Sequence, residues 1–279
     1  MDVIEDHVRV VRLGQGVDQL RIFHPEAMKR ARACFADYAK VIAKYPGISC
    51  KAVATSGSRD ARNSAEFFRE IQYDFKIPIE IISGVEEAQY SFFGGIPSDW
   101  KDIRNVAVLD IGGGSSELVG LQEKDSLFRF SFDMGCVRMT ERFLQSNPPS
   151  EEEITILRGF VRAELGRNRD LFDKVKGRRL IGVAGTATYL ASSDLGLEKF
   201  DPARVQGHQL TKKNIIALTE RLRKLTSEER LGIGGMDKGR ADVIIGGAII
   251  LEEILEAAEA SSIYISTRGL RYGLAMSDY

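Results

Sequence analysis

The segment that most limits the possible folds of this chain is VAVLDIGGGSSELVGLQ, residues 106–122. Two apolar runs are separated by three consecutive glycines, a pattern that predicts a tight β-hairpin. Glycine allows positive φ angles and close approach of other groups to the backbone, and successive N–H groups in such a turn bind anionic oxygens. The hairpin therefore predicts a phosphate-binding loop made of Gly112, Gly113, Gly114, Ser115 and Ser116.

Two acids flank this loop, since Asp110 ends the first apolar run and Glu117 precedes the second. Carboxylates bind divalent cations directly or through water, and Mg²⁺ often joins protein carboxylates to substrate phosphates. We therefore predict that Asp110 and Glu117 hold Mg²⁺ or another divalent cation beside a bound phosphate. The alternative is an ordinary glycine-rich hairpin with exposed acids.

Hydrophobic spacing divides the chain into two halves with the same alternation of strands and helices. The second half opens with a three-strand meander, in which the hairpin is followed by a strand at 126–132. In the first half, only the last strand of such a meander is present. The predicted elements of the first half are a strand at 8–13, a helix at 25–45, a strand at 51–55, a helix at 60–73 and a strand at 77–83.

Polar clusters follow the predicted strands, at the positions where α/β folds usually bind ligands. In TSGSRD (55–60), Arg59 either clamps an anion at the start of a helix or pairs with a surface acid. In SGVEE (83–87), one of the acids Glu86 and Glu87 orients a water molecule, or both only stabilise the first turn of a helix.

Two further clusters lie in the second half. In AGTAT (184–188), the small residues either let a phosphate approach a helix N-terminus or serve close packing of strand and helix. In STRGLR (266–271), Arg268 or Arg271 either reaches an anion or forms a solvated basic face. Arg240, near a predicted loop, is interpreted as a charge that promotes solubility.

Composition narrows the function classes. The 279 residues are 43% hydrophobic and 28% charged, as in a soluble globular protein, and no apolar stretch is long enough to span a bilayer. The acidic N-terminus lacks the features of a signal peptide, so we expect a cytoplasmic protein. A net charge of −1 argues against non-specific nucleic-acid binding. The three cysteines form no CxxC pair, and no P-loop motif occurs.

Several of these segments, taken in order, resemble the exopolyphosphatase/guanosine-pentaphosphate phosphohydrolase (Ppx/GppA) family. The pairing of ISGxEEA with DIGGGSxEL at this separation is highly specific, and the match spans nearly the whole chain. The matching segments are ATSGSRDARN (54–63), IEIISGVEEAQYSFFGG (79–95), VAVLDIGGGSSELV (106–119), MGCVRMTERF (134–143), GVAGTATYLA (182–191) and STRGLRYGLA (266–275).

The resemblance implies an α/β fold in which two ribonuclease-H-like domains with mixed sheets, of the actin/sugar-kinase/chaperone type, surround an interdomain phosphate cleft. The chain is similar to the short, two-domain form, with residues 1–96 plus 270–279 as the first domain and residues 97–269 as the second. The family normally opens with a strand, a phosphate loop and a second strand, which are absent here. We therefore expect the first domain to be N-terminally incomplete, and the chain as given to be less active than one extended upstream.

Phosphoanhydride hydrolysis depends on positioning and charge neutralisation more than on covalent catalysis. By position, the resemblance implies that Glu87 is the catalytic base and that Arg59 is a catalytic, phosphate-binding arginine. The other matched residues are Asp110 and Glu117 for Mg²⁺, residues 112–116 for the phosphate loop, and Gly185 and Thr186 for the loop that faces the terminal phosphate.

The activity implied by the resemblance is removal of terminal orthophosphate from inorganic polyphosphate by metal-assisted attack of water. Two alternatives stay open: a guanosine pentaphosphate 5′-phosphohydrolase, and a non-catalytic sensor that binds polyphosphate or an alarmone. The missing N-terminal loop is the only support for the sensor. Family members often dimerise, so the resemblance also implies a homodimer as a candidate assembly.

Overall fold

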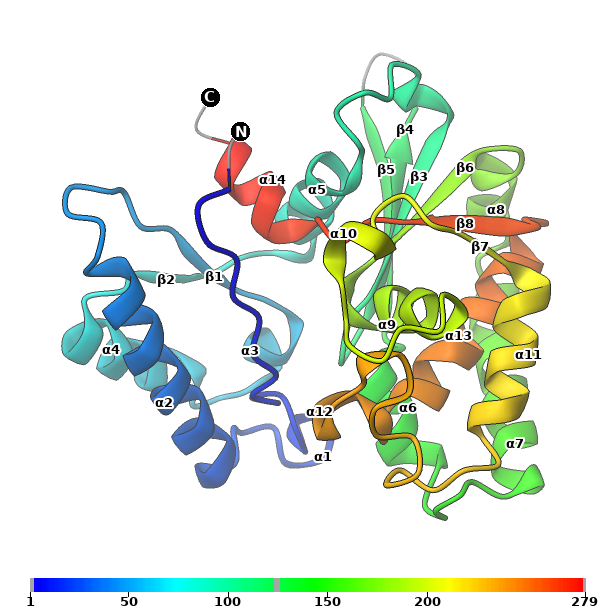
Figure 1. The fold of residues 1–279 in the computed structure, drawn as a ribbon, viewed down its shortest axis with the longest axis horizontal. Helices are drawn as coiled ribbons and strands as arrows, with labels where there is room; N and C mark the ends of the chain where they lie inside the picture. Colours follow the sequence, from blue (N-terminus) through cyan, green and yellow to red (C-terminus); the bar gives the residue numbers. More distant parts are fainter. Residues whose placement is uncertain (1–2, 123–125, 278–279) are drawn as a thin grey trace. The chain divides into compact units, whose positions relative to one another are not determined.

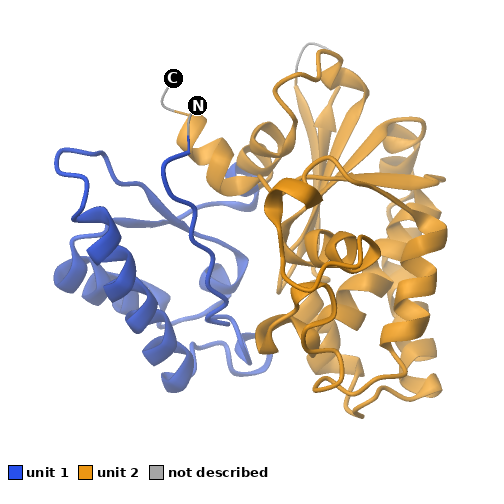
Figure 2. Ribbon diagram, in the orientation of Figure 1, with its two compact units in different colours: residues 1–87, 278–279 blue, residues 88–277 orange. Residues whose placement is uncertain are grey.

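The computed structural model describes residues 3–122 and 126–277, and it divides into two compact units (Figure 2). One unit extends to Glu87, and the other runs from Ala88 to Ser277. Each unit has its own sheet and its own hydrophobic core.

The domains expected from the sequence, 1–96 plus 270–279 and 97–269, stay a prediction. Parts of these ranges lie outside the described residues, namely 1–2, 123–125 and 278–279.

The first unit combines a two-stranded parallel sheet with helices (Figure 1). In this sheet β1 (Ala52–Ala54) pairs with β2 (Ile79–Ile81), so both strands end at the same edge. The helices are α1 (Val17–Leu20), α2 (Pro25–Ile42), α3 (Ser56–Asp60) and α4 (Ser64–Phe75), and α5 (Gly84–Gly95) begins in this unit.

The core of the first unit is aromatic. Phe23, Phe67 and Phe68 are buried, and their ring centroids lie 5.6 to 6.0 Å apart. The Asn63 side chain clamps the Phe23 backbone, because its Oδ1 accepts from Phe23 N at 2.7 Å and its Nδ2 donates to Phe23 O at 3.2 Å. This clamp lies between α3 and α4 and next to an extended Ala61, which explains why the single helix predicted for 60–73 is interrupted.

The prediction of a strand at 8–13 is wrong, since these residues form no strand. Backbone groups need hydrogen-bond partners, and here side chains of α2 provide them. Arg30 Nε donates to the Val11 carbonyl at 3.0 Å, and Tyr38 Oη donates to the His7 carbonyl at 3.2 Å. Val11 also packs against the core, so the alternating pattern reflects packing along a helix rather than pairing in a sheet.

The second unit is built on a mixed sheet with the strand order β5-β4-β3-β6-β8-β7 (Figure 1). β5, β4 and β3 form the predicted antiparallel meander, β6 and β8 continue it in parallel, and β7 is antiparallel to β8. This mixed sheet confirms the predicted α/β class. The strands are β3 (Val106–Ile111), β4 (Ser116–Leu121), β5 (Leu127–Phe132), β6 (Arg179–Val183), β7 (Gln209–Thr211) and β8 (Ser262–Ile265).

Helices cover both faces of this sheet. α5 packs on one face through Ala88 and Phe92, and α9 and α13 lie against the other. No helix among the described residues is both long and apolar enough to cross a membrane. The helices are α6 (Cys136–Phe143), α7 (Glu151–Gly166), α8 (Arg169–Val175), α9 (Ala184–Asp194), α10 (Pro202–Val205), α11 (Lys212–Leu222), α12 (Lys238–Ala241), α13 (Ile244–Ala257) and α14 (Leu270–Met276), with 3₁₀ turns at Ile103–Asn105 and Ile233–Gly235.

Strand alternation decides which side chains reach α5. Successive side chains of a strand point to opposite faces of the sheet. On β3, Val106 and Val108 pack with α5, whereas Leu109 and Ile111 join the larger core beneath α9 and α13. The same alternation places Asp110, near the end of β3, on the α5 face.

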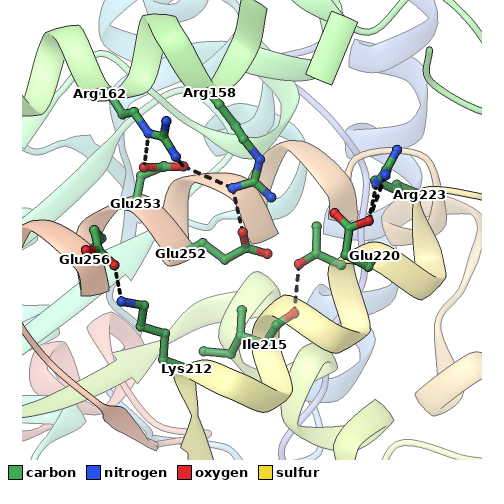
Figure 3. A network of polar contacts seen from close by, with 10 residues as sticks. Arg158, Arg162, Lys212, Ile215, Glu220, Arg223, Glu252, Glu253 and Glu256 are labelled. Carbon is green, nitrogen blue, oxygen red and sulfur yellow. Dashed lines mark hydrogen bonds and ion pairs between the residues drawn. The ribbon is translucent and has the colours of Figure 1, made fainter. Parts of the chain in front are cut away.

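Two buried acids anchor the core helix α13. Glu252 and Glu253 are each 4% exposed, and Figure 3 shows Arg158 and Arg162 of α7 reaching them. Arg158 lies 2.6 Å from Glu252 and 3.0 Å from Glu253, and Arg162 Nε donates to Glu253 at 2.7 Å. Burial disfavours the charge on Arg158, but the two carboxylates outweigh it and raise the pKa of Arg158. The network therefore ties α7 to α13.

Replacing Arg158 with Met should lower the free energy of unfolding by about 3–5 kcal/mol, because buried carboxylates lose their charged partner. Urea unfolding at neutral pH measures this loss. The matched control is Lys176→Met, which removes an ion pair with Glu259 whose two side chains are more than half exposed; it should cost less than about 1 kcal/mol. Equal losses in the two variants would contradict the importance of the buried network.

Candidate functional site

The ends of β1 and β2 bring Arg59 and Glu87 together in the first unit. β1 leads into α3, which carries Arg59, and its neighbour β2 leads into α5, which carries Glu87. Arg59 Nη1 donates to Glu87 Oε2 and to the Ile82 carbonyl, both at 2.9 Å. Glu87 is 8% exposed. A buried carboxylate is thus held in one orientation by a permanently charged partner.

The two adjacent acids of α5 have different partners. Glu86 Oε2 accepts from the Ser83 backbone N at 2.9 Å and from the Ser83 hydroxyl at 2.7 Å, while Glu86 N donates to Ser83 Oγ at 3.2 Å. This is a capping box, and its hydrogen bonds, that from the Ser83 N–H first, lower the pKa of Glu86. Glu86 therefore stabilises the helix start. Glu87, one residue and about 100° further round the helix, faces Arg59.

In the second unit, Asp110 and Glu117 lie directly opposite each other across the β3–β4 hairpin. Asp110 Oδ2 accepts from the Ser91 hydroxyl, and Glu117 Oε1 accepts from the Ser131 hydroxyl, each at 2.8 Å. Glu117 is only 2% exposed. Like charges at directly opposed positions are destabilising, so a bound cation would stabilise this pair.

This donor set fits a hard divalent cation such as Mg²⁺. Mg²⁺ prefers oxygen ligands and usually takes one or two protein carboxylates, with water and substrate phosphates completing its coordination. No group of three or more His, Cys, Asp or Glu side chains suited to a metal occurs in the described parts of the chain. A cation at Asp110 and Glu117 would therefore have to share its coordination with water or a ligand.

The turn between β3 and β4 rests on the start of α6. The Gly112 carbonyl accepts from Cys136 N at 2.9 Å, and the Gly113 carbonyl accepts from the next two N–H groups of α6, each at 3.0 Å. These helix N–H groups have no partner within the helix. Gly135 makes the contact possible, because a Cβ at this position would lie 2.3 Å from the Gly113 carbonyl. The helix start and the turn thus hold each other in place.

The glycines of the turn do not adopt unusual backbone angles. None of residues 112–114 has a φ angle in the left-handed region, so the positive φ that the sequence permits is not used. The N–H groups of residues 113–115 have no hydrogen-bond acceptor among the described residues, and this leaves them open to an anion. The Ser116 hydroxyl is engaged elsewhere, since it donates to the Met134 carbonyl.

Three parallel strands of the second unit end at one edge of the sheet. Asp110 on β3 pairs with Val183 on β6, and Gly182 on β6 pairs with Ile265 on β8. The turn after β3 therefore lies beside the start of α9, which follows β6, and the segment 266–271 follows β8. The fold brings together three of the clusters that the sequence singled out.

The start of α9 is tightly built. Ala184 has a φ of 63°, a left-handed conformation that costs a non-glycine residue about 1–2 kcal/mol. A Cβ on Gly185 would lie 2.2 Å from Cζ of Arg240, so the missing side chain makes room for this guanidinium. Thr186 is 2% exposed, and a Cβ on Gly247 of α13 would lie 2.5 Å from its Oγ1. Thr186 thus turns its hydroxyl to the core and contributes only its backbone to the helix start.

Arg240 is a candidate site residue that the sequence reasoning missed. It is far from Gly185 in the sequence, and no motif connects the two residues. A buried arginine supports the segment that carries it: Arg230, 2% exposed, donates from Nη1 to the Ala241 carbonyl at 3.0 Å. Its other donors reach carbonyls at and just beyond the end of α11, at 2.9 and 2.7 Å. Arg230 thus fastens α12 to α11, and α12 places Arg240 on Gly185.

Comparisons with known proteins give a consistent result. A family described as the Ppx/GppA phosphatase family matches residues 1–279. Exopolyphosphatase 2 of Mycobacterium tuberculosis is 34% identical over 283 residues, covering 98% of this chain and 88% of that protein. The crystal structure of an exopolyphosphatase-like protein is similar with a TM-score of 0.92 at 33% identity, covering 100% of this chain and 92% of that chain. That of an exopolyphosphatase from Cytophaga hutchinsonii has a TM-score of 0.86 at 26% identity, with 96% and 86% covered.

Replacing Gly135 with Ala should displace the β3–β4 turn and lower the free energy of unfolding by about 1–3 kcal/mol, because the added methyl overlaps the Gly113 backbone. Chemical denaturation gives the stability, and amide NMR shifts of residues 112–116 report the turn. Gly159→Ala is the control, since a Cβ there meets no atom within 4 Å; this change in the middle of α7 should stabilise by about 0.5–1 kcal/mol. A stable Gly135→Ala variant with unshifted turn amides would contradict the contact.

Proposed function

Because the chain belongs to the Ppx/GppA phosphatase family, we propose that it hydrolyses phosphoanhydride bonds and releases terminal orthophosphate from inorganic polyphosphate. The observation that carries this choice of substrate is the likeness to Exopolyphosphatase 2 of Mycobacterium tuberculosis, 34% identity over 98% of this chain. The proposed nucleophile is water, and the proposed cofactor is Mg²⁺ at Asp110 and Glu117.

In the proposed reaction, Glu87 accepts a proton from the attacking water. The water oxygen bonds to the terminal phosphorus, the bridging P–O bond breaks, and the shortened chain leaves. The burial of Glu87 and its hydrogen bond from Arg59 support this role, because a base must be held in one orientation.

Charge on the phosphoryl oxygens must be neutralised as the bond breaks. A divalent cation, when bound, would neutralise part of this charge. The chain's own donors for the rest are the N–H groups of residues 113–115, the start of α9 at Gly185 and Thr186, and two arginines. Arg59 has Nη1 engaged, but neither its Nε nor its Nη2 has an acceptor among the described residues. Arg240 lies at Gly185 and is the proposed second arginine.

Replacing Glu87 with Gln should lower kcat by roughly 10²- to 10⁴-fold, because a general base is lost while shape is kept. Orthophosphate release from tripolyphosphate and from long-chain polyphosphate with Mg²⁺ measures the effect. Chelation of the cation with EDTA should abolish release in the unaltered protein. Binding of polyphosphate to the Glu87→Gln variant should persist.

Glu86→Gln is the matched control, since it alters an adjacent acid that caps the helix. It should lower thermal stability slightly and leave kcat nearly unchanged. A Glu87→Gln variant as active as the parent would exclude Glu87 as the base. If kcat/KM is higher for guanosine pentaphosphate than for polyphosphate, guanosine pentaphosphate is the preferred substrate. If the protein binds polyphosphate or guanosine pentaphosphate but hydrolyses neither, a sensor role is favoured.

Replacing Arg240 with Gln should lower kcat/KM by roughly a hundredfold, the usual loss for one well-placed group that stabilises transition-state charge. Steady-state kinetics on tripolyphosphate and a thermal melt of the same sample separate lost catalysis from lost folding. Lys213→Gln, an equal charge change at an exposed position of α11, is the control. Similar kinetics of the two variants would remove Arg240 from the site.

A further inference from the structure

A cationic groove runs along the edge of the second unit's sheet, apart from the phosphate loop. It has a volume of about 590 Å³ and lies where the edge strand β5 meets the corner between α7 and α8. We call it the basic groove. Its charged lining residues are Arg129, Arg167, Arg169, Lys174 and Asp170.

The basic groove departs from the charge balance of the chain. Among the described residues, four cations face one carboxylate there, whereas the whole protein carries a net charge of −1. Arg129, Arg169 and Lys174 are exposed and form no ion pair with any described residue, and Arg167 pairs only with a partly exposed Glu164. The arginines shown in Figure 3, by contrast, are all paired with acids. Unpaired cations around one concavity attract a polyanion.

The floor of the basic groove suits a phosphate chain better than a nucleic acid. Proteins that bind single strands combine positive charge with exposed aromatic rings on which bases stack. Here Phe128 is 5% exposed, and Phe130 is partly buried with its ring centroid 4.6 Å from that of Phe132. The groove therefore offers charge with little open aromatic surface.

The distance between the basic groove and the phosphate loop sets the minimum length of a ligand that can contact both. β4 begins at Ser116 beside the loop and ends at Leu121, which pairs with Leu127 at the groove. A strand of this length spans about 17 Å. A long linear polyphosphate reaches that far, whereas a tripolyphosphate does not.

We propose that the basic groove binds the body of a long polyphosphate chain while the end of that chain is held at the phosphate loop. The identity of the ligand rests on the proposed function. Two linked contacts on one chain raise the apparent affinity without any new contact at the reacting end. Affinity should therefore depend on chain length, and Arg129, Arg169 and Lys174 determine that dependence.

The test is the triple variant Arg129→Gln, Arg169→Gln, Lys174→Gln, with binding of long-chain polyphosphate measured in EDTA so that no turnover occurs. Affinity should fall at least roughly tenfold. The slope of log K against log salt should become shallower by about 2, since each lost phosphate contact removes roughly 0.7. Turnover of tripolyphosphate with Mg²⁺ should stay within about twofold of the parent.

The matched control is Lys199→Gln, Lys213→Gln, Lys224→Gln, which removes the same charge from exposed positions outside the groove. It should bind as the parent does. Unchanged binding in the groove variant, an equal loss in the control, or full displacement of polyphosphate by a single-stranded oligonucleotide of equal charge would each overturn the proposal. Because binding is measured without hydrolysis, a parent protein that binds in the groove but releases no phosphate would refute the proposed function alone.

Discussion

The main-chain contact between the β3–β4 turn and the start of α6 is the constraint on which the site depends. The turn directs its carbonyls at helix N–H groups, and the N–H groups of residues 113–115 stay unoccupied on the same loop. The contact requires glycine at position 135, because a Cβ on any other residue there would overlap the Gly113 carbonyl group. Strand alternation adds the second element, since it carries Asp110 and Glu117 to the same face of the sheet. The proposed anion donors and the proposed cation ligands thus come from one hairpin.

Much of the second unit could be predicted from its sequence, because its signals are local. The hairpin and the meander depend on residues close together in the chain, and so does the start of α7, where Ser150 and Glu153 form a capping box. A local signal also separates the two acids of α5: Ser83 and Glu86 have the spacing of a capping box, which leaves Glu87 as the acid without a capping role. The alternation of apolar and polar residues at 8–13 led to the wrong prediction of a strand, because a segment that packs along α2 can show the same pattern.

The remaining features of the site depend on contacts between distant residues and could not be predicted from one sequence. Arg240 became a candidate only when the fold placed its guanidinium on Gly185. The segment that carries Arg240 is held by Arg230, a buried cation that donates to three backbone carbonyls. Desolvation by burial lowers the pKa of Arg230. Charged residues are almost never fully buried unless paired, so composition gave no reason to expect such a support. Thr186 is the opposite case: it belongs to a motif that the sequence singles out, but in the fold its hydroxyl packs against Gly247.

The division of roles between Glu86 and Glu87 has a consequence for how this chain can vary. Both acids are glutamates, and only their order after β2 decides which one caps α5 and which one meets Arg59. Insertion or deletion of one residue between β2 and α5 would rotate the helix start by about 100°, so that Glu87 would no longer face Arg59. The length of the connection Ile82-Ser83 therefore decides which of the two acids meets Arg59.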